Sequence, residues 1–545
     1  MRSARPLFRL LVSVCFTLLI GPIRQTTAQS SSQTVNDVNA SGIKPFGSAV
    51  GNDIEYVDLN NGGVNVRIPF VAKKGRGVDF DLKIPYSSKF WFIYNDPNSH
   101  LDFWGLASEN DSEVGWMSRF PNLTSTWQQL VCYDPNNPDA YENRFVFQDM
   151  EGAKHSFDND TGTPCSASLT RDYSKDMNGM MLKTPQLFGP HTLYWANGLK
   201  YKFQQSASLL PYLLDSIEDA NGNIVTRTFV NGPPAGQDTE TWTDALGGTV
   251  AVRKFGPGGN YTSPLGVSIG ARPLTSVSFT DSNGNPQTYT LAWVAIDIFC
   301  TFTNYCATTN SYPALVLSQI TLPNGQSYRF GYKDTTGAYN PGGELMRIDL
   351  PSGGYVRYEY QNVLNSENNP VRGINSCAPS ALTTVDSRVV TKRVHSPDGV
   401  REDVWTYSYG RTYSSGLVAQ KNTTVTNPDG NQEIYTFNRV SPQNGCLFFD
   451  TSHEYRQGST TAIKRIDQTW QYDVDWRQEN INHRVVTRTV TLPQTNQVAK
   501  TAFSYDQMRA TGAASSHAVT SSKPKNTTME PAVRGLYYAL KYVPS

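Results

Sequence analysis

Apolar and polar residues alternate along most of this chain in short segments, and glycine-containing turns separate the segments. Alternation with a period of two places the apolar side chains on one face of a β-strand. Residues 64–70 and 78–86 alternate in this way on either side of a short polar turn, which predicts a β-hairpin. Helical periodicity is nearly absent, so the pattern predicts an all-β protein.

From about residue 146 onward one unit recurs: a strand, a turn rich in Asn, Asp and Gly, and a strand in which aromatic and polar residues alternate. Asn and Asp tolerate the left-handed conformation, and Gly adopts positive φ without steric cost. A single hairpin cannot bury its apolar face alone, so neighbouring hairpins must stack. We expect an irregular array of β-hairpins that forms an extended, twisting or spiral sheet, with an N-terminal β region before it. The expected turn glycines are Gly152, Gly198, Gly222, Gly247, Gly284, Gly325, Gly353, Gly399 and Gly430.

Several short motifs follow one another in an order that carries a family resemblance. They lie at 65–69, 75–77, 84–88, 114–116, 149–152 with His155 and Phe157, 197–198 with Tyr201 and Phe203, 217–223 and 243–247. Over residues 50–440 this succession resembles the N-terminal portion of the Rhs/YD-repeat family of secreted proteins. The resemblance implies hairpins wound into a spiral β-sheet, which in that family is often a hollow shell around a C-terminal toxin or a surface-displayed stalk.

The chain also departs from the family plan. Gly248 stands where the last of these motifs usually has Arg. Late Tyr-Asp pairs stand at 472–473 and 505–506, but dense tandem copies are missing, as is the arginine-rich motif that precedes a toxin. The stretch after residue 504 is rich in Ser, Thr and Lys and short for a toxin domain. We therefore expect an incomplete, open spiral.

The N-terminus has the composition of a secretory signal peptide. Arg2, Arg5 and Arg9 precede an apolar stretch at 10–20 that is too short to span a bilayer, and a small-residue cleavage site ends at Ala28. We expect a secreted or cell-surface chain, with an N-terminal membrane anchor as the alternative. No other stretch approaches roughly 18 consecutive apolar residues, so we expect no membrane span in the mature chain. The expected organisation is a signal peptide at 1–28, a linker at 29–50, an N-terminal β region with an aromatic cluster at 51–190, a hairpin repeat array at 191–510 and a polar tail at 511–545.

Charge and composition narrow the expected partners. The chain balances 47 Lys and Arg against 47 Asp and Glu, so it offers no net positive charge for nucleic acid. Hydrophobic residues make up 38% and charged residues 17%, with 29 Tyr and 24 Phe, which predicts a folded chain. A cell-surface polysaccharide or protein is the expected partner.

Cysteine usage agrees with export. Cys15 lies in the predicted signal peptide, and the six remaining cysteines are an even number that predicts disulfides in an oxidising compartment. Their connectivity is open; sequential pairing is the simplest, with Cys300 and Cys306 closing a short loop. A metal site is the weaker alternative, because the chain has no C-x-x-C motif. The six are Cys132, Cys165, Cys300, Cys306, Cys377 and Cys446.

Catalytic and metal-binding motifs occur only in unsuitable contexts. Residues 266–270 match the G-x-S-x-G nucleophile motif, but the alternating segment after Pro273 predicts a strand where the motif requires a helix. His453 and Glu454 lack the second histidine of a zinc-protease helix. Residues 158–162 resemble the start of a calcium loop, but Leu169 stands where such a loop ends in glutamate. We expect no catalytic residue, no cofactor and no metal site.

Four tryptophans form the best candidate for a binding platform. Trp91, Trp104, Trp116 and Trp127 crowd into one segment with several Phe and Tyr residues. Exposed rings would form a flat surface for sugar rings or a protein partner. The same rings would otherwise fill the core where the opening sheet meets the repeats. We favour the core, because large aromatic side chains are mostly buried.

The sequence thus favours a secreted or surface-exposed structural or interaction protein of Rhs/YD-repeat type without catalytic chemistry. Such a protein would act in cell-surface contact or as a shell-like scaffold. Two alternatives stay open. One is a carbohydrate-binding or carbohydrate-active β protein that uses an aromatic cleft, and the other is a truncated toxin-delivery shell.

Overall fold

The computed structural model describes residues 47–508 and 521–524, with gaps at 74–77, 96–101, 107, 110–112, 119–120, 130–140, 160–171, 175–178, 184–189, 207–208, 234–235, 302–310, 363–387, 415–416, 440–447 and 475–479. The predicted signal peptide and most of the predicted linker and tail lie outside the described residues. Within them the secondary structure is β-strand and no helix occurs, which confirms the all-β prediction. Over the same ranges there is no helix long and apolar enough to cross a membrane.

The chain opens with a small antiparallel sheet, called here the N-terminal sheet. Its strands are β1 (Ala49–Gly51), β2 (Glu55–Asp58), β3 (Val64–Lys73) and β4 (Phe80–Ser87), in that order. The predicted hairpin is β3 paired with β4, with Ile68 opposite Ile84 and a bulge between Pro69 and Val71. The alternating apolar residues of both strands are buried, as the pattern predicts.

Two short hairpins follow, and then one long ladder of antiparallel strands. The short hairpins are β5 (Trp91–Asn95) with β6 (Asp102–Leu106), and β7 (Ser108–Glu109) with β8 (Glu113–Val114). The first part of the ladder is β9 (Asn122–Gln129), β10 (Tyr141–Gln148), β11 (Lys154–Asn159), β12 (Asp172–Ser174), β13 (Met181–Lys183), β14 (His191–Tyr194), β15 (Lys200–Ser206), β16 (Leu209–Glu218), β17 (Ile224–Val230), β18 (Asp238–Thr243), β19 (Thr249–Phe255), β22 (Leu274–Thr280) and β23 (Pro286–Ile298).

The ladder continues to the end of the described chain. Its second part is β24 (Tyr312–Thr321), β25 (Ser327–Gly331), β26 (Arg347–Asp349), β27 (Tyr355–Gln361), β28 (Val389–Ser396), β29 (Asp403–Ser414), β30 (Leu417–Thr426), β31 (Gln432–Arg439), β32 (Phe448–Gln457), β33 (Thr461–Val474), β34 (Asn480–Leu492) and β35 (Gln497–Ala502). Two hairpins stand outside it: β20 (Gly259–Thr262) with β21 (Ser268–Ala271), and β36 (Tyr505–Met508) with β37 (Ser521–Pro524).

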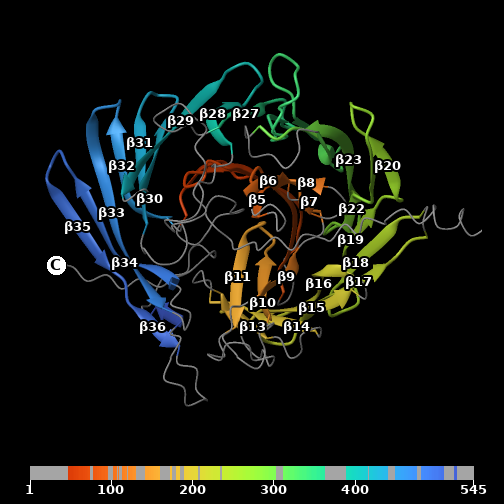
Figure 1. Ribbon diagram of the computed structural model, residues 1–545. Helices are drawn as coiled ribbons and strands as arrows, with labels where there is room; N and C mark the ends of the chain where they lie inside the picture. Colours follow the sequence, from red (N-terminus) through yellow and green to blue (C-terminus); the bar gives the residue numbers. More distant parts are fainter. Residues whose placement is uncertain are drawn as a thin grey trace, which may run out of the picture.

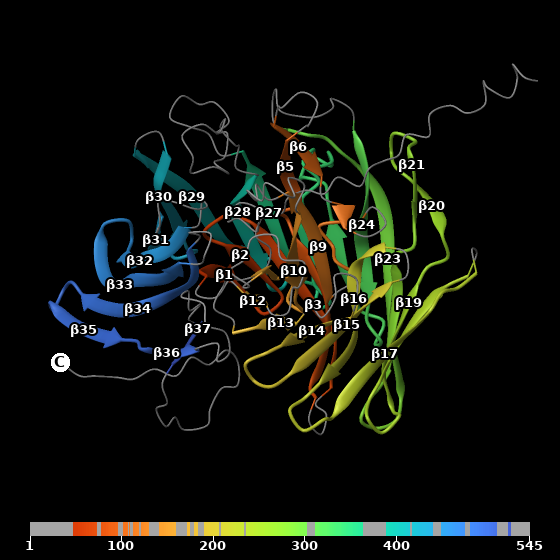
Figure 2. The same ribbon diagram turned by 60° about the horizontal axis from the view of Figure 1, so that its bottom comes forward.

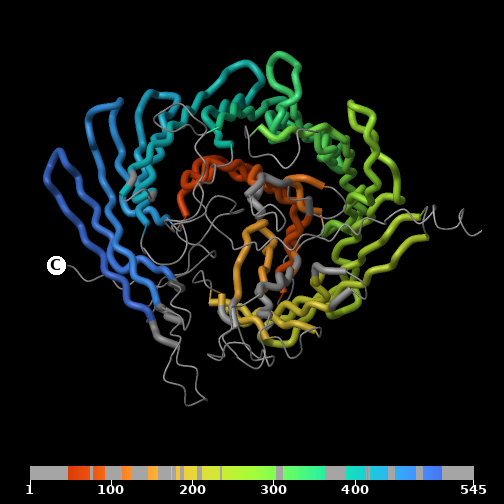
Figure 3. Tube along the Cα trace, viewed as in Figure 1, coloured from red at the N-terminus to blue at the C-terminus, as the bar shows by residue number. Residues whose placement is uncertain are grey.

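The ladder curves around the N-terminal sheet. In Figure 1 the strands from β14 to β35 form a broad rim, and the red and orange N-terminal strands lie inside it. Figure 2 shows the same arrangement from another side, and the tube in Figure 3 follows the opening segment through the interior. Strands β9 to β16 return on one another, because β16 pairs with β9 as well as with β15. At the other end, β35 pairs only with β34 among the described strands, so the expected extended, twisting sheet is present and its end is open.

One turn type closes ten of the hairpins. In each, the first residue of a five-residue loop donates its N–H to the carbonyl of the fifth, and the glycine at position four donates to the carbonyl of the first. All nine expected turn glycines have positive φ. Gly266 and Gly337 close two further turns that the sequence analysis did not identify. The turn chemistry is local, and the sequence therefore predicted the hairpins well.

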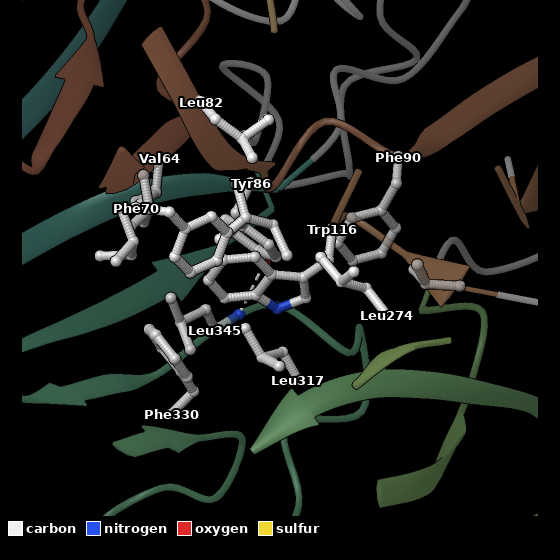
Figure 4. Packing of buried hydrophobic residues seen from close by; sticks show 14 of the residues in the cluster. Val64, Phe70, Leu82, Tyr86, Phe90, Trp116, Leu274, Leu317, Phe330 and Leu345 are labelled. Carbon is white, nitrogen blue, oxygen red and sulfur yellow. Dashed lines mark hydrogen bonds between the residues drawn. The ribbon is translucent and has the colours of Figure 1, made fainter. Parts of the chain in front are cut away.

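The hydrophobic core lies between the N-terminal sheet and the inner face of the ladder. Trp116 occupies its centre, with its ring 5.0 Å from that of Tyr86 and 4.7 Å from that of Phe330. Figure 4 shows these rings together with Leu317 and Leu345. One cluster of buried residues runs from β2 through β32, so the opening strands and the hairpin array share a core.

Candidate functional site

A buried polar site lies at the seam where the N-terminal sheet meets the ladder. At its centre Arg393 of β28 holds Glu55 of β2, with Nε 3.1 and 3.2 Å from the two carboxylate oxygens and Nη2 in closer contact with one of them. Tyr358 Oη donates to the same carboxylate at 2.7 Å. Glu55 is 0% exposed and Arg393 2% exposed, so water does not screen this pair.

Strand geometry aims these groups at one another. Glu55 lies two residues before Val57 in β2, so both side chains face the ladder. Arg393 lies opposite Trp405 in the β28–β29 pair, and its guanidinium stands 4.5 Å from the centre of that ring. Burial and the Glu55 carboxylate together raise the pKa of Tyr358 well above its usual value, so its hydroxyl stays a donor.

Further bonds extend the seam along β28, β30 and β32. The Val390 N–H donates to the Gly62 carbonyl at 3.0 Å, and Thr423 Oγ1 donates to the Leu59 carbonyl at 2.6 Å. Ser48 Oγ donates to Asp450 Oδ2 at 2.6 Å, in a setting where burial raises the pKa of the Asp450 carboxyl. The N-terminal sheet is therefore bonded to strands that are more than three hundred residues away in sequence.

A second buried charged group ties the segment after β8 to the ladder. Glu240 lies between Arg227 and Arg253, with Arg227 Nε 2.7 Å and Arg253 Nε 2.6 Å from its oxygens, and Trp242 donates its indole N–H to it. Burial raises the pKa of Glu240, but the two guanidiniums outweigh burial and lower it overall. Arg253 also donates to the Ser118 carbonyl at 2.9 Å. The cavity beside these groups is only about 10 Å³, which holds no organic ligand.

Two of the four tryptophans of the predicted platform lie in the core. Trp91 is 1% exposed and donates its indole N–H to the Gly342 carbonyl at 3.0 Å. Trp116 is 0% exposed and donates to Tyr332 Oη at 2.7 Å. Neither ring reaches the surface, so neither contributes to an exposed platform. Trp104 lies in β6 opposite Ile93, and Trp127 lies in β9 opposite Asn143.

The G-x-S-x-G match is a turn followed by a strand. Gly266 has a φ of 82° and closes the loop that begins at Ser263. Ser268 starts β21 and pairs with Thr262, so it does not sit on the strand-to-helix turn that exposes a catalytic serine. Asp297 accepts from Ser263 Oγ at 2.7 Å and fixes this hairpin.

His453 belongs to an aromatic cluster on the inner face of β31 and β32. Its ring lies 3.8 Å from Tyr435 and 4.0 Å from Tyr455, and Nε2 is 3.1 Å from Glu433 Oε2. The contact with His453 lowers the pKa of Glu433. Among the described residues, the hydrogen-bond partner of the His453 ring is Glu433.

The candidate metal and disulfide positions fall mostly outside the described residues. Asp158 and Asn159 of the calcium-like segment lie in β11, whereas the rest of that segment is outside. Within the described ranges no three His, Cys, Asp or Glu side chains form a group that would hold a metal ion. Cys300 packs partly buried against the core. The other five cysteines, Cys132, Cys165, Cys306, Cys377 and Cys446, are outside, so the disulfide pairing stays a prediction.

The sequence analysis missed the seam residues Glu55 and Arg393 and the buried Glu240. A signal was present, since Glu240 and Trp242 share one strand face, as do Arg253 and Phe255. A charged residue in the inward register of an alternating strand must find a partner inside the protein. The sequence shows which charged residues occupy inward positions, but it does not show which of them contact one another.

Comparisons with known proteins show only distant likenesses. No family model matches the chain, and no curated protein matches it. A porin-like protein from Bacteroides uniformis ATCC 8492 aligns at 11% identity with a TM-score of 0.18, over 60% of this chain and 97% of that one. A TcdB2-TccC3-TEV structure aligns at 10% identity with a TM-score of 0.16, over 84% of this chain and 22% of that one. The Photorhabdus luminescens Tc holotoxin pore aligns at 10% identity with a TM-score of 0.16, over 84% of this chain and 29% of that one. The chain thus spans under a third of these toxin chains, and at such TM-scores the likenesses carry no argument.

Proposed function

We propose that this chain is a secreted or cell-surface scaffold of Rhs/YD-repeat type, which presents a curved β-sheet to a partner and performs no catalysis. The seam between Glu55 and Arg393 is the observation that carries the proposal. These converging polar side chains, Glu55, Arg393 and Tyr358, are directed at one another within the same chain, where they join the N-terminal sheet to the ladder. Shape maintenance is therefore the function that this geometry supports best.

The resemblance in sequence supports the Rhs/YD assignment, and the structure gives its motifs a role. Asp219, Gly222 and Asn223 of one motif close the hairpin between β16 and β17, with Asp219 Oδ1 accepting from the Asn221 and Asn223 N–H groups at 2.9 and 2.8 Å. Asp244 does the same in the next motif, toward Leu246 and Gly248 at 3.0 and 2.8 Å. These motifs are turn-closing units, which is what repeated hairpins in a spiral require.

Location and partner are tested with the full chain in its own host. We expect fractionation to recover the mature chain outside the cytoplasm, with an N-terminus near Gln29 by mass spectrometry. A chain that stays in the cytoplasm with residues 1–28 intact would overturn the secreted part of the proposal. Saturable retention of the purified chain on whole cells supports the surface role. Release of sugars or other products during that incubation contradicts a non-catalytic scaffold.

A delivery shell is a narrower version of the same proposal. It would place a cargo against the inner face of β31 to β33, where Tyr455 is partly buried and the Glu433 side chain is 30% exposed. The test addresses a cargo that is carried by a separate chain. Co-purification of such a chain, lost when Tyr455 is replaced by Asp, would favour delivery over contact at the outer surface.

A further inference from the structure

Strands β9 to β16 form a ring that closes on a short contact. Each of these strands pairs with the next, and β16 also pairs with β9. The closing contact consists of two residue pairs, Tyr212 opposite Leu123 and Leu213 opposite Asn122 (Figure 1). By comparison, β9 and β10 share eight residue pairs. Separation of β9 from β16 therefore opens the ring and leaves its longer pairings intact.

His191 of β14 is buried in this ring, next to the closing contact. Its ring centre lies 4.5 Å from that of Tyr212, edge to face, and 5.0 Å from that of Phe145 on β10. In the β14–β15 pair it lies opposite Phe203, which is also buried. The imidazole is 0% exposed, and neither of its nitrogens has a hydrogen-bond partner among the described residues. His191 is therefore a titratable group in an aromatic setting, and it touches a residue that closes the ring.

The neighbouring strands direct no charged side chain at His191 within the described residues. The titratable residues in the inward register are two tyrosines: Tyr212, and Tyr201, which lies opposite Leu193 and whose pKa is raised by burial. The strand β9 has no titratable residue. Charged residues elsewhere on these strands alternate with the inward positions: Glu142 and Arg144 on β10, Lys183 on β13, Lys202 on β15 and Asp215 on β16. Lys202 donates to Glu218 at 2.8 Å, and Asp215 accepts from Gln204 at 3.2 Å.

A proton on His191 is costly while the ring is closed. The imidazolium would be a buried charge with neither a counter-ion nor a hydrogen-bond acceptor. Burial accordingly lowers the pKa of His191 from 6.5 to about 4 in the closed ring. In an open ring, water reaches the imidazole, and the pKa returns towards 6.5. Between pH 6.5 and 4 the open state therefore binds a proton that the closed state does not, and acid favours opening.

We propose that protonation of His191 separates β16 from β9, so that the ring of eight strands opens in acid while the rest of the ladder stays folded. The pair of β12 with β13 is as short as the closing contact, but the ring that His191 touches at 4.5 Å is that of Tyr212 in β16. Opening exposes the apolar interior of the ring, including Leu123, Phe145 and Tyr212. This acid response is independent of the scaffold proposal, because it concerns the ring and not the seam.

Both sides of the opening keep their own attachments in this pH range. Glu151, in the turn between β10 and β11, binds Arg67 and Lys83 of the N-terminal sheet. Burial raises the pKa of Glu151, but Lys83 and Arg67 outweigh burial and lower it overall, so the carboxylate stays charged above pH 4.5. On the other side, β16 continues into the ladder through its pairing with β17. The ring therefore opens between two parts of the protein that stay in place.

The test is amide hydrogen exchange of the purified full chain at pH 7 and pH 5, read by mass spectrometry and corrected for the intrinsic pH dependence of exchange. Peptides that cover β9 and β16 report on the closing contact, and peptides that cover β24 report on the ladder. The pKa values of 6.5 and about 4 predict that opening becomes about twentyfold more frequent at pH 5. We expect this loss of protection in β9 and β16, little change in β24, and full recovery on return to pH 7.

Variants identify the group that takes the proton. His191→Phe cannot be protonated and should keep β9 and β16 protected at pH 5; His191→Leu serves the same purpose if the larger ring prevents folding. His395→Phe is the matched control, because His395 is a partly buried histidine of β28, outside the ring, and its replacement should leave the acid response intact. Unchanged protection of β9 and β16 in the original chain at pH 5 overturns the proposal. An equal loss in β24, or a full acid response in the His191 variants, overturns it as well.

Discussion

Glu55 and Arg393 are 338 residues apart in the sequence, and their side chains form a buried ion pair with contacts to both carboxylate oxygens. The pair joins the second strand of the chain to the middle of the hairpin ladder. Without its partner, each side chain would be a buried charge with no counter-ion. Burial of both charges therefore favours the structure in which the two strands lie together. This ion pair helps to explain why the N-terminal sheet lies inside the curve of the ladder.

The first prediction concerns this pair. Arg393→Met leaves Glu55 buried without its cation, and we expect it to lower the free energy of unfolding by about 3–5 kcal/mol. Glu55→Leu combined with Arg393→Met removes both charges and should lose less than Arg393→Met alone. Urea unfolding followed by tryptophan fluorescence measures both.

Arg401→Met is the matched control, since Arg401 pairs with Asp403 but its side chain is 71% exposed. We expect a change below about 1 kcal/mol there. If Arg393→Met and Arg401→Met lose the same amount, the seam does not hold the sheet together as described.

The second prediction concerns acid stability and His191. This side chain is 0% exposed, its ring lies 5.0 Å from Phe145 and 4.5 Å from Tyr212, and neither ring nitrogen has a partner among the described residues. Burial lowers the pKa of His191 from 6.5 to about 4. Between pH 4 and pH 6.5, His191 binds a proton in the unfolded chain but not in the folded chain. The stabilisation is therefore complete above pH 6.5 and falls as the pH drops to about 4, by about 3 kcal/mol in total.

His191→Phe removes this titration while keeping an aromatic ring in place. We expect the variant to lose less stability than the original chain between pH 6.5 and 4, measured as unfolding midpoints at several pH values. An identical pH profile for the two proteins would show that another group is responsible.

The third prediction concerns a turn glycine. Gly222 has a φ of 86°, and a Cβ added there meets no atom within 4 Å, so the cost of Gly222→Ala is backbone strain alone. We expect a loss of about 1–2 kcal/mol in the free energy of unfolding. Gly222→Asn should lose less, because asparagine tolerates this conformation. Gly198→Ala should lose more than Gly222→Ala, since its Cβ would also lie 2.9 Å from the Cβ of Ala220.

Differential scanning calorimetry of the three glycine variants measures their losses of stability and so gives the order of these losses. Equal losses for Gly222→Ala and Gly222→Asn would contradict a positive φ at this turn.

The fourth prediction concerns the two kinds of tryptophan. Trp116→Phe removes the indole N–H that donates to Tyr332 and reduces the volume of a fully buried side chain, and we expect a loss of about 2 kcal/mol. Trp195→Phe is the control, because Trp195 is only partly buried and its indole N–H has no partner among the described residues. The urea midpoint should fall for Trp116→Phe and change little for Trp195→Phe. A larger loss at Trp195 would contradict the central place of Trp116 in the core.

The sequence by itself determined the elements. The alternation at 64–70 and 78–86 predicted β3 and β4, and turn residues such as Asp219 and Gly222 predicted where hairpins reverse. These features depend on neighbours within a few residues, because strand alternation and turn conformation are local properties of the backbone. For the same reason the sequence argued against a nucleophile elbow at Ser268, which lies in β21.

Only the tertiary structure decided what those strands enclose. The meeting of Glu55 with Arg393, the burial of Trp91 and Trp116, and the contact of His191 with Tyr212 all depend on how twist and bulges accumulate over many strands. Small changes in twist per strand add up along the ladder, so the sequence of one hairpin does not show where it lies on the curve. The shape of the whole sheet therefore determines which residues far apart in the sequence come into contact. The sites of this protein, which consist of such contacts, depend on that shape as well.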